Sequence, residues 1–242
     1  APTAFVLDRR LRVLATVSMT EPATFLARID EAVRRADQGA PASETTAPIL
    51  VVPRVFEPAF CQELIDLYER LGGEQSGFMQ SDPQGRTIYA FDPKHKTRRD
   101  RIVEDEAVRE QIRERLRRRV VPEIKKAFQF DVTRIERDLV ACYSAEEGGH
   151  FRAHRDNTTK GTAHRRFAVS INLATDRHEG GDLRFPEFGD RTYRPESGGA
   201  VVFSCSVLHE ATPVTAGQRY CVLPFLYDES AARIRAENLK FI

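Results

Sequence analysis

Apolar residues recur at every fourth position from residue 104 to residue 128, which is the spacing of one face of an α-helix. The pattern predicts an amphipathic helix that is redirected near Pro122, because proline removes a hydrogen bond from a helix interior. A second helix is predicted at 58–71, where the pair Gly72-Gly73 ends the apolar stripe. A short strand is predicted just before it, at 49–52.

After residue 134 the pattern changes to short apolar runs that are separated by glycine-rich turns. Runs of this length between turn residues are typical of strands. The predicted strands are 135–144, 167–174, 183–185, 200–204 and 220–227. Many short strands predict an α+β protein built on a double-stranded β-helix, or jelly roll, with the helices packed outside it.

The first forty residues form a separate pattern. Two apolar runs within 4–18 flank a charged turn, and a helix is predicted at 23–36. This strand-strand-helix appendage, 1–40, is followed by a small, polar, proline-bearing stretch at 41–48 that has the composition of a linker. The main domain is therefore expected at 49–242.

Composition and charge narrow the classes of function. The formal net charge is +1 although 30% of the residues are charged, and the arginines at 113–119 are balanced by nearby carboxylates, so neither nucleic acid nor a membrane surface is an expected partner. Four scattered cysteines suggest a reducing compartment. With no apolar run long enough to cross a bilayer, we expect a soluble cytoplasmic protein, and the oligomeric state is left open.

Residues 74–100 show no sustained periodicity and mix glycine, serine and proline with aromatic residues. Two interpretations remain open. A long irregular segment in a compact domain is commonly a lid or a binding loop, so this stretch is a candidate for substrate contact. The alternative is a disordered segment without a role.

Candidate metal ligands lie in the stretch 143–157. His154 and Asp156 are two positions apart in an apparently extended segment, so both side chains point to one face and can reach one ion. His209 is the candidate third ligand. Two imidazoles and one carboxylate leave coordination positions open, an arrangement associated with non-haem Fe(II) oxygenases.

Four further residues attract attention for their polarity. Asn172 lies within an apolar run and needs a hydrogen-bond partner if it is buried, so it is a candidate to bind the cosubstrate. Thr212, three residues past His209, is a candidate to line a cosubstrate pocket. His164 and His178 lie in polar loops, where we expect them to be solvated.

The segments around these residues resemble the prolyl 4-hydroxylase-like branch of the 2-oxoglutarate- and iron(II)-dependent dioxygenases. The matching stretches are Tyr143, GGHFRAHRDN, SINL, GGDLRFPEFG, PESGGAVVFS and LHEATPVTAGQRYCVLPFL. The resemblance covers about 135–228 and, more loosely, 49–134. It implies that His154, Asp156 and His209 bind Fe(II), and that Arg219 and Tyr143 bind the distal carboxylate of 2-oxoglutarate. It also implies O2 as cosubstrate, with ascorbate as a candidate additional reductant.

A weaker resemblance links residues 1–40 to the C-terminal end of a thioredoxin-like or peroxiredoxin domain. The matching part lacks the half of that fold that would carry a redox cysteine, so no peroxidase activity is inferred from it. Together with the start at Ala1, it raises the expectation that the chain is processed or is a piece of a longer, redoxin-fused protein.

The favoured function is hydroxylation of an unactivated C–H bond, most readily that of a prolyl residue in a peptide or protein. A small amino acid or metabolite is the next substrate class. A cupin-type jelly roll that binds metal without 2-oxoglutarate is the alternative from another class, and a non-catalytic domain with a relic site is a third. Arg219 distinguishes the first two, because a guanidinium pairs a carboxylate at two points and a cupin has no need of it.

Overall fold

The computed structural model describes residues 2–8, 11–20, 22–37 and 45–241, and the chain divides into two compact units. One unit contains residues 1–47 together with 185–191, and the other contains 48–184 and 192–242. In the first, β1 (Thr3–Leu7) pairs antiparallel with β2 (Val13–Ser18), and α1 (Pro22–Asp37) follows, which confirms the predicted strand-strand-helix. The predicted linker at 41–48 falls largely outside the described residues.

The helices of the second unit follow the apolar periodicity with one difference. The helix α2 spans Pro58–Leu71 as predicted, and α5 spans Glu229–Asn238. The stretch expected to be one redirected helix is two helices, α3 (Glu106–Arg119) and α4 (Val121–Phe128), that meet at Val120. Proline fits the first turn of a helix, where its missing N–H has no partner to lose, so Pro122 begins α4 instead of bending α3.

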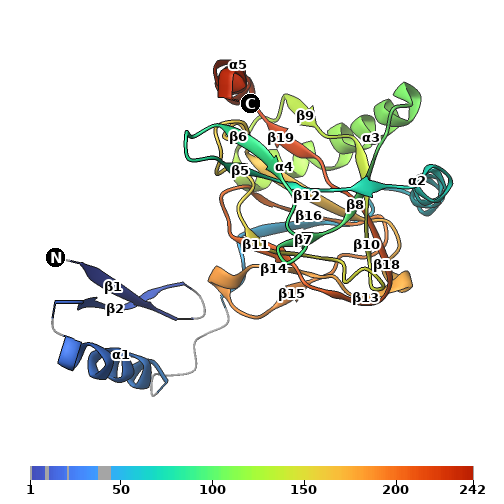
Figure 1. The fold of residues 1–242 in the computed structure, drawn as a ribbon. Helices are drawn as coiled ribbons and strands as arrows, with labels where there is room; N and C mark the ends of the chain where they lie inside the picture. The colour runs from blue at the N-terminus through green and yellow to red at the C-terminus, as the bar shows by residue number, and fades with distance from the viewer. Residues whose placement is uncertain (1, 9–10, 21, 38–44, 242) are drawn as a thin grey trace. The chain divides into compact units, whose positions relative to one another are not determined.

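Two antiparallel sheets make up the jelly roll, and Figure 1 shows α2, α3 and α4 outside them. The larger sheet has ten strands: β3 (Ile49–Val52), β16 (Ala200–Ser204), β12 (Phe167–Asn172), β18 (Val214–Val222), β10 (Leu139–Ser144), β8 (Arg99–Ile102), β4 (Glu74–Gln75), β13 (His178–Gly180), β19 (Phe225–Tyr227) and β9 (Arg134–Glu136). The smaller has five: β15 (Thr192–Tyr193), β14 (Leu183–Arg184), β17 (His209–Ala211), β11 (His150–His154) and β7 (Lys96–Thr97).

Strand β10 shows how the two faces of the larger sheet are used. Val140 and Cys142 point to the core that the helices cover, whereas Ala141 and Tyr143 belong to a second apolar cluster, which Phe151 of the smaller sheet joins. Because side chains alternate along a strand, the buried residues of β10 contribute to both apolar clusters, one on each face of the larger sheet. The space between the two sheets is therefore lined from both sides.

The prediction that residues 74–100 are irregular or disordered is wrong. They form β4, a hairpin of β5 (Phe78–Ser81) and β6 (Thr87–Ala90), then β7 and the start of β8. Strands of two to four residues are too short to show a period of two in the sequence. The segment joins both layers, since β8 pairs with β10 of the larger sheet and β7 with β11 of the smaller.

None of the described helices is both long and apolar enough to cross a membrane.

Candidate active site

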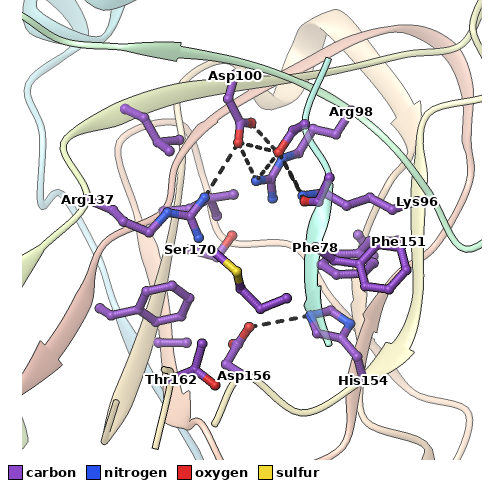
Figure 2. Close-up of a pocket in the computed structure, with 18 of the residues that line it drawn as sticks. Phe78, Lys96, Arg98, Asp100, Arg137, Phe151, His154, Asp156, Thr162 and Ser170 are labelled. Carbon is purple, nitrogen blue, oxygen red and sulfur yellow. Dashed lines mark hydrogen bonds and ion pairs between the residues drawn. The ribbon is translucent and has the colours of Figure 1, made fainter. Parts of the chain in front are cut away.

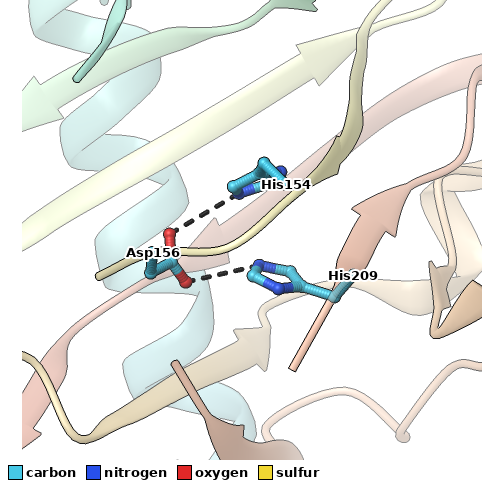
Figure 3. Close-up of side chains that lie close together, drawn as sticks. All are labelled: His154, Asp156 and His209. Atoms are coloured by element: carbon cyan, nitrogen blue, oxygen red, sulfur yellow. Dashed lines mark ion pairs between the residues drawn. The ribbon is translucent and has the colours of Figure 1, made fainter. Parts of the chain in front are cut away.

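Three side chains with metal-binding atoms converge at the smaller sheet (Figure 3). His154 ends β11 and faces His209 of β17 in the antiparallel register, and Asp156 follows two residues after the end of β11. The Asp156 carboxylate lies 3.5 Å from His154 Nε2 and 3.3 Å from His209 Nε2. One ligand atom from each residue lies within 4.8 Å of the others, a spacing that a single ion can bridge.

Backbone carbonyls set the orientation of both imidazoles. Nδ1 of His154 lies 2.8 Å from the carbonyl of Arg152, and Nδ1 of His209 lies 3.0 Å from the carbonyl of Val207. A carbonyl only accepts hydrogen bonds, so each Nδ1 carries the proton and each Nε2 keeps its lone pair for the centre of the triad. Phe151 stacks on His154 with ring centroids 3.5 Å apart and restricts its rotation.

The protonation states suit metal binding. Burial and the neighbouring His209 lower the pKa of His154 to about 4, so its imidazole is neutral near pH 7. Burial raises the pKa of Asp156, but its interactions with His209 and His154 lower it more, and the pKa lies well below its ordinary value. Two imidazole Nε2 atoms and one carboxylate are presented together, the donor set of the facial triad of non-haem Fe(II) sites.

A buried arginine faces the triad from the larger sheet. Arg219 is 2% exposed, and its guanidinium donates hydrogen bonds to Asn172 Oδ1 and Ser170 Oγ at 2.9 to 3.2 Å. Both acceptors are neutral, and no described carboxylate lies within ion-pair distance of Arg219. A buried guanidinium without a counter-charge is costly, which makes this position suited to an anion.

Tyr143 lies beside Arg219. The two residues pair across β10 and β18, and the guanidinium carbon is 5.3 Å from the tyrosine ring centroid. The Tyr143 hydroxyl accepts a hydrogen bond from Arg98 at 3.3 Å. Burial raises the pKa of Tyr143, so the hydroxyl stays protonated and retains a hydrogen to donate.

The triad, Arg219 and Tyr143 line one cavity of about 950 Å³ between the sheets. Figure 2 shows part of its lining, with His154 and Asp156 among the labelled residues. Segment 74–100 contributes a large share of its wall, including Phe78, Lys96 and Arg98. The earlier expectation that this segment contacts a substrate therefore stays a prediction, now for an ordered cavity wall.

Comparison with known proteins bears on this arrangement. Residues 139–227 match the family model of the 2OG-Fe(II) oxygenase superfamily, where 2OG is 2-oxoglutarate. These residues form a 2OG-Fe(II) oxygenase domain. The match covers β10 to β19 and so includes all three triad residues, Tyr143 and Arg219.

Solved prolyl hydroxylases share the fold of this oxygenase domain. A Trichoplax adhaerens prolyl hydroxylase in complex with a hypoxia inducible factor peptide fragment is 18% identical, with TM-score 0.56 over 79% of this chain and 87% of that one. A Pseudomonas putida prolyl-4-hydroxylase is 16% identical, with TM-score 0.53 over 76% of this chain and 94% of that one. The viral collagen prolyl hydroxylase of Paramecium Bursaria Chlorella virus-1, solved as a 2OG complex, is 15% identical, with TM-score 0.51 over 75% of this chain and 96% of that one.

The oxygenase superfamily requires Fe(II), 2-oxoglutarate and O2, and the residues of this chain fit the first two. The triad offers two imidazole Nε2 atoms and one carboxylate, and Arg219 offers a buried cationic fork to a carboxylate. The match to this superfamily supports an oxidoreductase, and it disfavours the cupin-type alternative. The assignment of individual residues to iron and cosubstrate stays a prediction.

The structure places the two other predicted cosubstrate residues outside the described lining of the cavity. Thr212 accepts a hydrogen bond from the backbone N–H of Asp182, because the residue three past His209 points to the opposite face of an extended segment. Asn172 does not line the cavity either and instead accepts from Arg219. Ser170, which the sequence analysis missed, does line it; its place two residues before Asn172 was the available signal.

The expectation that His164 and His178 are solvated is wrong. His164 is 2% exposed, and its Nε2 lies 2.5 Å from the carboxylate of Glu136. His178 is 5% exposed, and its Nδ1 lies 3.0 Å from the carbonyl of Gly180. His178 lies in β13, which pairs with β18, and His164 packs against Tyr227 of β19 and Glu136 of β9. This burial is a tertiary effect that local composition does not reveal.

Proposed function

We propose that this oxygenase hydroxylates a prolyl residue in a peptide or protein substrate. In this proposal His154, Asp156 and His209 hold Fe(II), and Arg219 and Tyr143 hold the distal carboxylate of 2-oxoglutarate. The observation that carries the proposal is the buried Arg219, whose described partners are neutral, in the same cavity as the triad. The fold shared with prolyl hydroxylases supports the substrate class by analogy alone.

Each residue has a physical task in this reaction. When bound, iron and 2-oxoglutarate would together activate O2, which supplies the oxidising equivalents needed to break an unactivated C–H bond, while 2-oxoglutarate is converted to succinate and CO2. Arg219 and Tyr143 orient the cosubstrate from the larger sheet, while the Nδ1 hydrogen bonds keep His154 and His209 in the tautomer that binds metal. Phe78 and Phe151 line the cavity with apolar surface, which limits the access of water to the reacting centre.

Turnover with defined substrates tests the proposal. The purified protein with Fe(II) and 2-oxoglutarate under air should form succinate, and a panel of proline-containing peptides should stimulate succinate formation and acquire a hydroxyl group, measured by mass spectrometry. Asp156→Ala is the matched inactive control. Stimulation by free amino acids alone would replace the prolyl-peptide proposal with the small-molecule class, and no succinate under any condition would contradict the oxygenase activity.

A further inference from the structure

The cavity contains a second group of cations, apart from Arg219. Lys96, Arg98 and Arg137, termed the basic cluster below, surround the carboxylate of Asp100 (Figure 2). Arg98 forms a two-point ion pair with Asp100 at 2.6 and 2.7 Å, and Arg137 lies 3.5 Å from the same carboxylate. Within the described part of the chain, Asp100 is the only carboxylate at ion-pair distance from Arg98 and Arg137, so two guanidiniums share one carboxylate, and Lys96 has no carboxylate at that distance.

Lys96 is the member of the cluster whose hydrogen-bond partners are all neutral. It is 5% exposed, and its ammonium donates to Ser76 Oγ at 2.7 Å and to the carbonyl of Gly77 at 2.5 Å. The ammonium also lies 4.9 Å from the centroid of the Phe151 ring. These contacts satisfy hydrogen bonds but supply no negative charge, so burial favours the neutral amine over the ammonium unless an anion lies nearby.

Burial acts against the charged forms of two members of the cluster. Burial and the charge of Arg98 lower the pKa of Lys96 to about 5 and that of Arg137 to about 10. Arg137 is also held at a φ of 71°, a backbone conformation that non-glycine residues rarely adopt and that is enriched at functional sites. Another anion near these side chains would favour their charged forms.

The basic cluster and Arg219 are separate places for an anion. Tyr143 lies near both, with the guanidinium carbons of Arg98 and Arg219 at 5.6 and 5.3 Å from its ring centroid. Arg219 bonds to Ser170 and Asn172, whereas the cluster is organised by Asp100 and Ser76. Figure 2 shows the cluster at one end of the drawn cavity and His154 with Asp156 at the other. The negative charge of Asp156 still acts on the cluster, because it raises the pKa of both Lys96 and Arg137.

We propose that the basic cluster binds a carboxylate of the substrate, and so selects substrates that carry one close to the hydroxylated carbon. This inference rests on the proposed function and adds a substrate class to it. A carboxylate suits the site because an arginine fork binds its two oxygens together. The carboxylate has two sources, an acidic side chain next to the target residue or the free α-carboxylate of an amino acid or peptide end.

Binding of matched probe pairs separates these sources. The pairs are a prolyl peptide with Asp or Asn beside the proline, the same neutral peptide with a free or amidated C-terminus, and L-proline or L-prolinamide. Binding is measured by calorimetry to the protein loaded with Mn(II) and 2-oxoglutarate under nitrogen, so that no turnover intervenes. We expect the carboxylate member of at least one pair to bind about 10- to 100-fold more tightly, as for a charge-assisted contact.

Variants assign the preference to the cluster. Arg137→Gln and Lys96→Gln should each reduce the preference to about threefold or less, whereas Arg137→Lys should retain part of it. Arg118→Gln, which changes a side chain that is 75% exposed on α3, is the matched control and should leave it unchanged. Thermal unfolding of each variant shows whether the fold is intact.

Other outcomes would overturn the inference. Equal binding of both members in every pair would do so, as would no binding of any probe. A loss of 2-oxoglutarate affinity in Arg137→Gln, with the preference unchanged, would assign the cluster to the cosubstrate. Succinate formation without substrate tests the proposed function separately, because it requires the triad and Arg219 but no substrate carboxylate.

Discussion

Replacing Arg219 by methionine removes the charge and the hydrogen-bonding fork while roughly keeping the length of the side chain. The guanidinium is 2% exposed, so a carboxylate bound to it would form a buried ion pair. Removing one partner of such a pair costs about 3–5 kcal/mol. Since each 1.4 kcal/mol corresponds to a factor of ten, the dissociation constant of 2-oxoglutarate should rise between about one hundredfold and a few thousandfold.

The assay is calorimetric titration of 2-oxoglutarate into the Mn(II)-loaded protein without oxygen. Arg219→Lys keeps a charge but loses the planar fork, so its affinity should fall between those of the wild type and Arg219→Met. Arg118→Met, on the exposed face of α3, is the control for loss of an arginine. Metal binding should be unchanged in all three variants, because no hydrogen bond or ion pair joins Arg219 to the triad among the described residues.

Two results would refute this reasoning. If Arg219→Met binds 2-oxoglutarate within about threefold of the wild type, the proposed carboxylate contact is wrong, since even one charged hydrogen bond is worth about 1.5–3 kcal/mol. If the variant loses metal as well, Arg219 supports the architecture of the site in addition to, or instead of, binding the cosubstrate. Thermal unfolding distinguishes a local loss of metal from general destabilisation.

Three further predictions concern the metal, pH and the backbone. Asp156→Asn should lose most bound iron, measured by elemental analysis, because it removes the only anionic ligand of the triad. Burial raises the pKa of Glu136, but His164 and Arg165 lower it more, from 4.5 to about 2. Glu136→Gln should therefore cost about 3 kcal/mol of unfolding free energy at pH 7, and the difference from wild type should shrink as pH falls from 4.5 to about 2, measured by urea denaturation. Gly198→Ala should destabilise at least twice as much as Gly148→Ala, expected at about 1 kcal/mol, in thermal unfolding. Both glycines have positive φ, but only at Gly198 would a Cβ meet backbone, 2.2 Å from Phe56 O.

The parts of the site that follow a strand's own geometry could be predicted from the sequence. His154 and Asp156 were paired by their two-residue spacing, and they lie together in the structure. The same alternation, applied to Thr212, places it on the opposite face from His209, in agreement with its position outside the described lining of the cavity, and its role at the cosubstrate stays a prediction. The fold class could be predicted from the many short strands and glycine-rich turns. The one long helix predicted at 104–128 is two helices in the structure, which meet at Val120.

The basic cluster could not be predicted because its burial is a tertiary property. Lys96 and Arg98 come from a segment of very short strands, and Arg137 from the connection between β9 and β10. From the sequence alone, the side chains of Lys96, Arg98 and Arg137 would be expected on the surface, as most lysines and arginines are. Only the pairing of β7 with β11 and of β8 with β10 places the segment that contains Lys96 and Arg98 in the wall of the cavity.

The two proposed anchors of the cosubstrate belong to different sheets, so the packing between the sheets sets their separation. The triad is carried by β11, β17 and the residues after β11, whereas Arg219 lies on β18. Phe151 stacks on His154 and shares an apolar cluster with Tyr143, which in turn lies against Arg219. Since close-packed interiors change shape little, this apolar path holds the metal ligands at a defined distance from the guanidinium. A cosubstrate that must reach both at once is therefore selected by its length as well as by its charge.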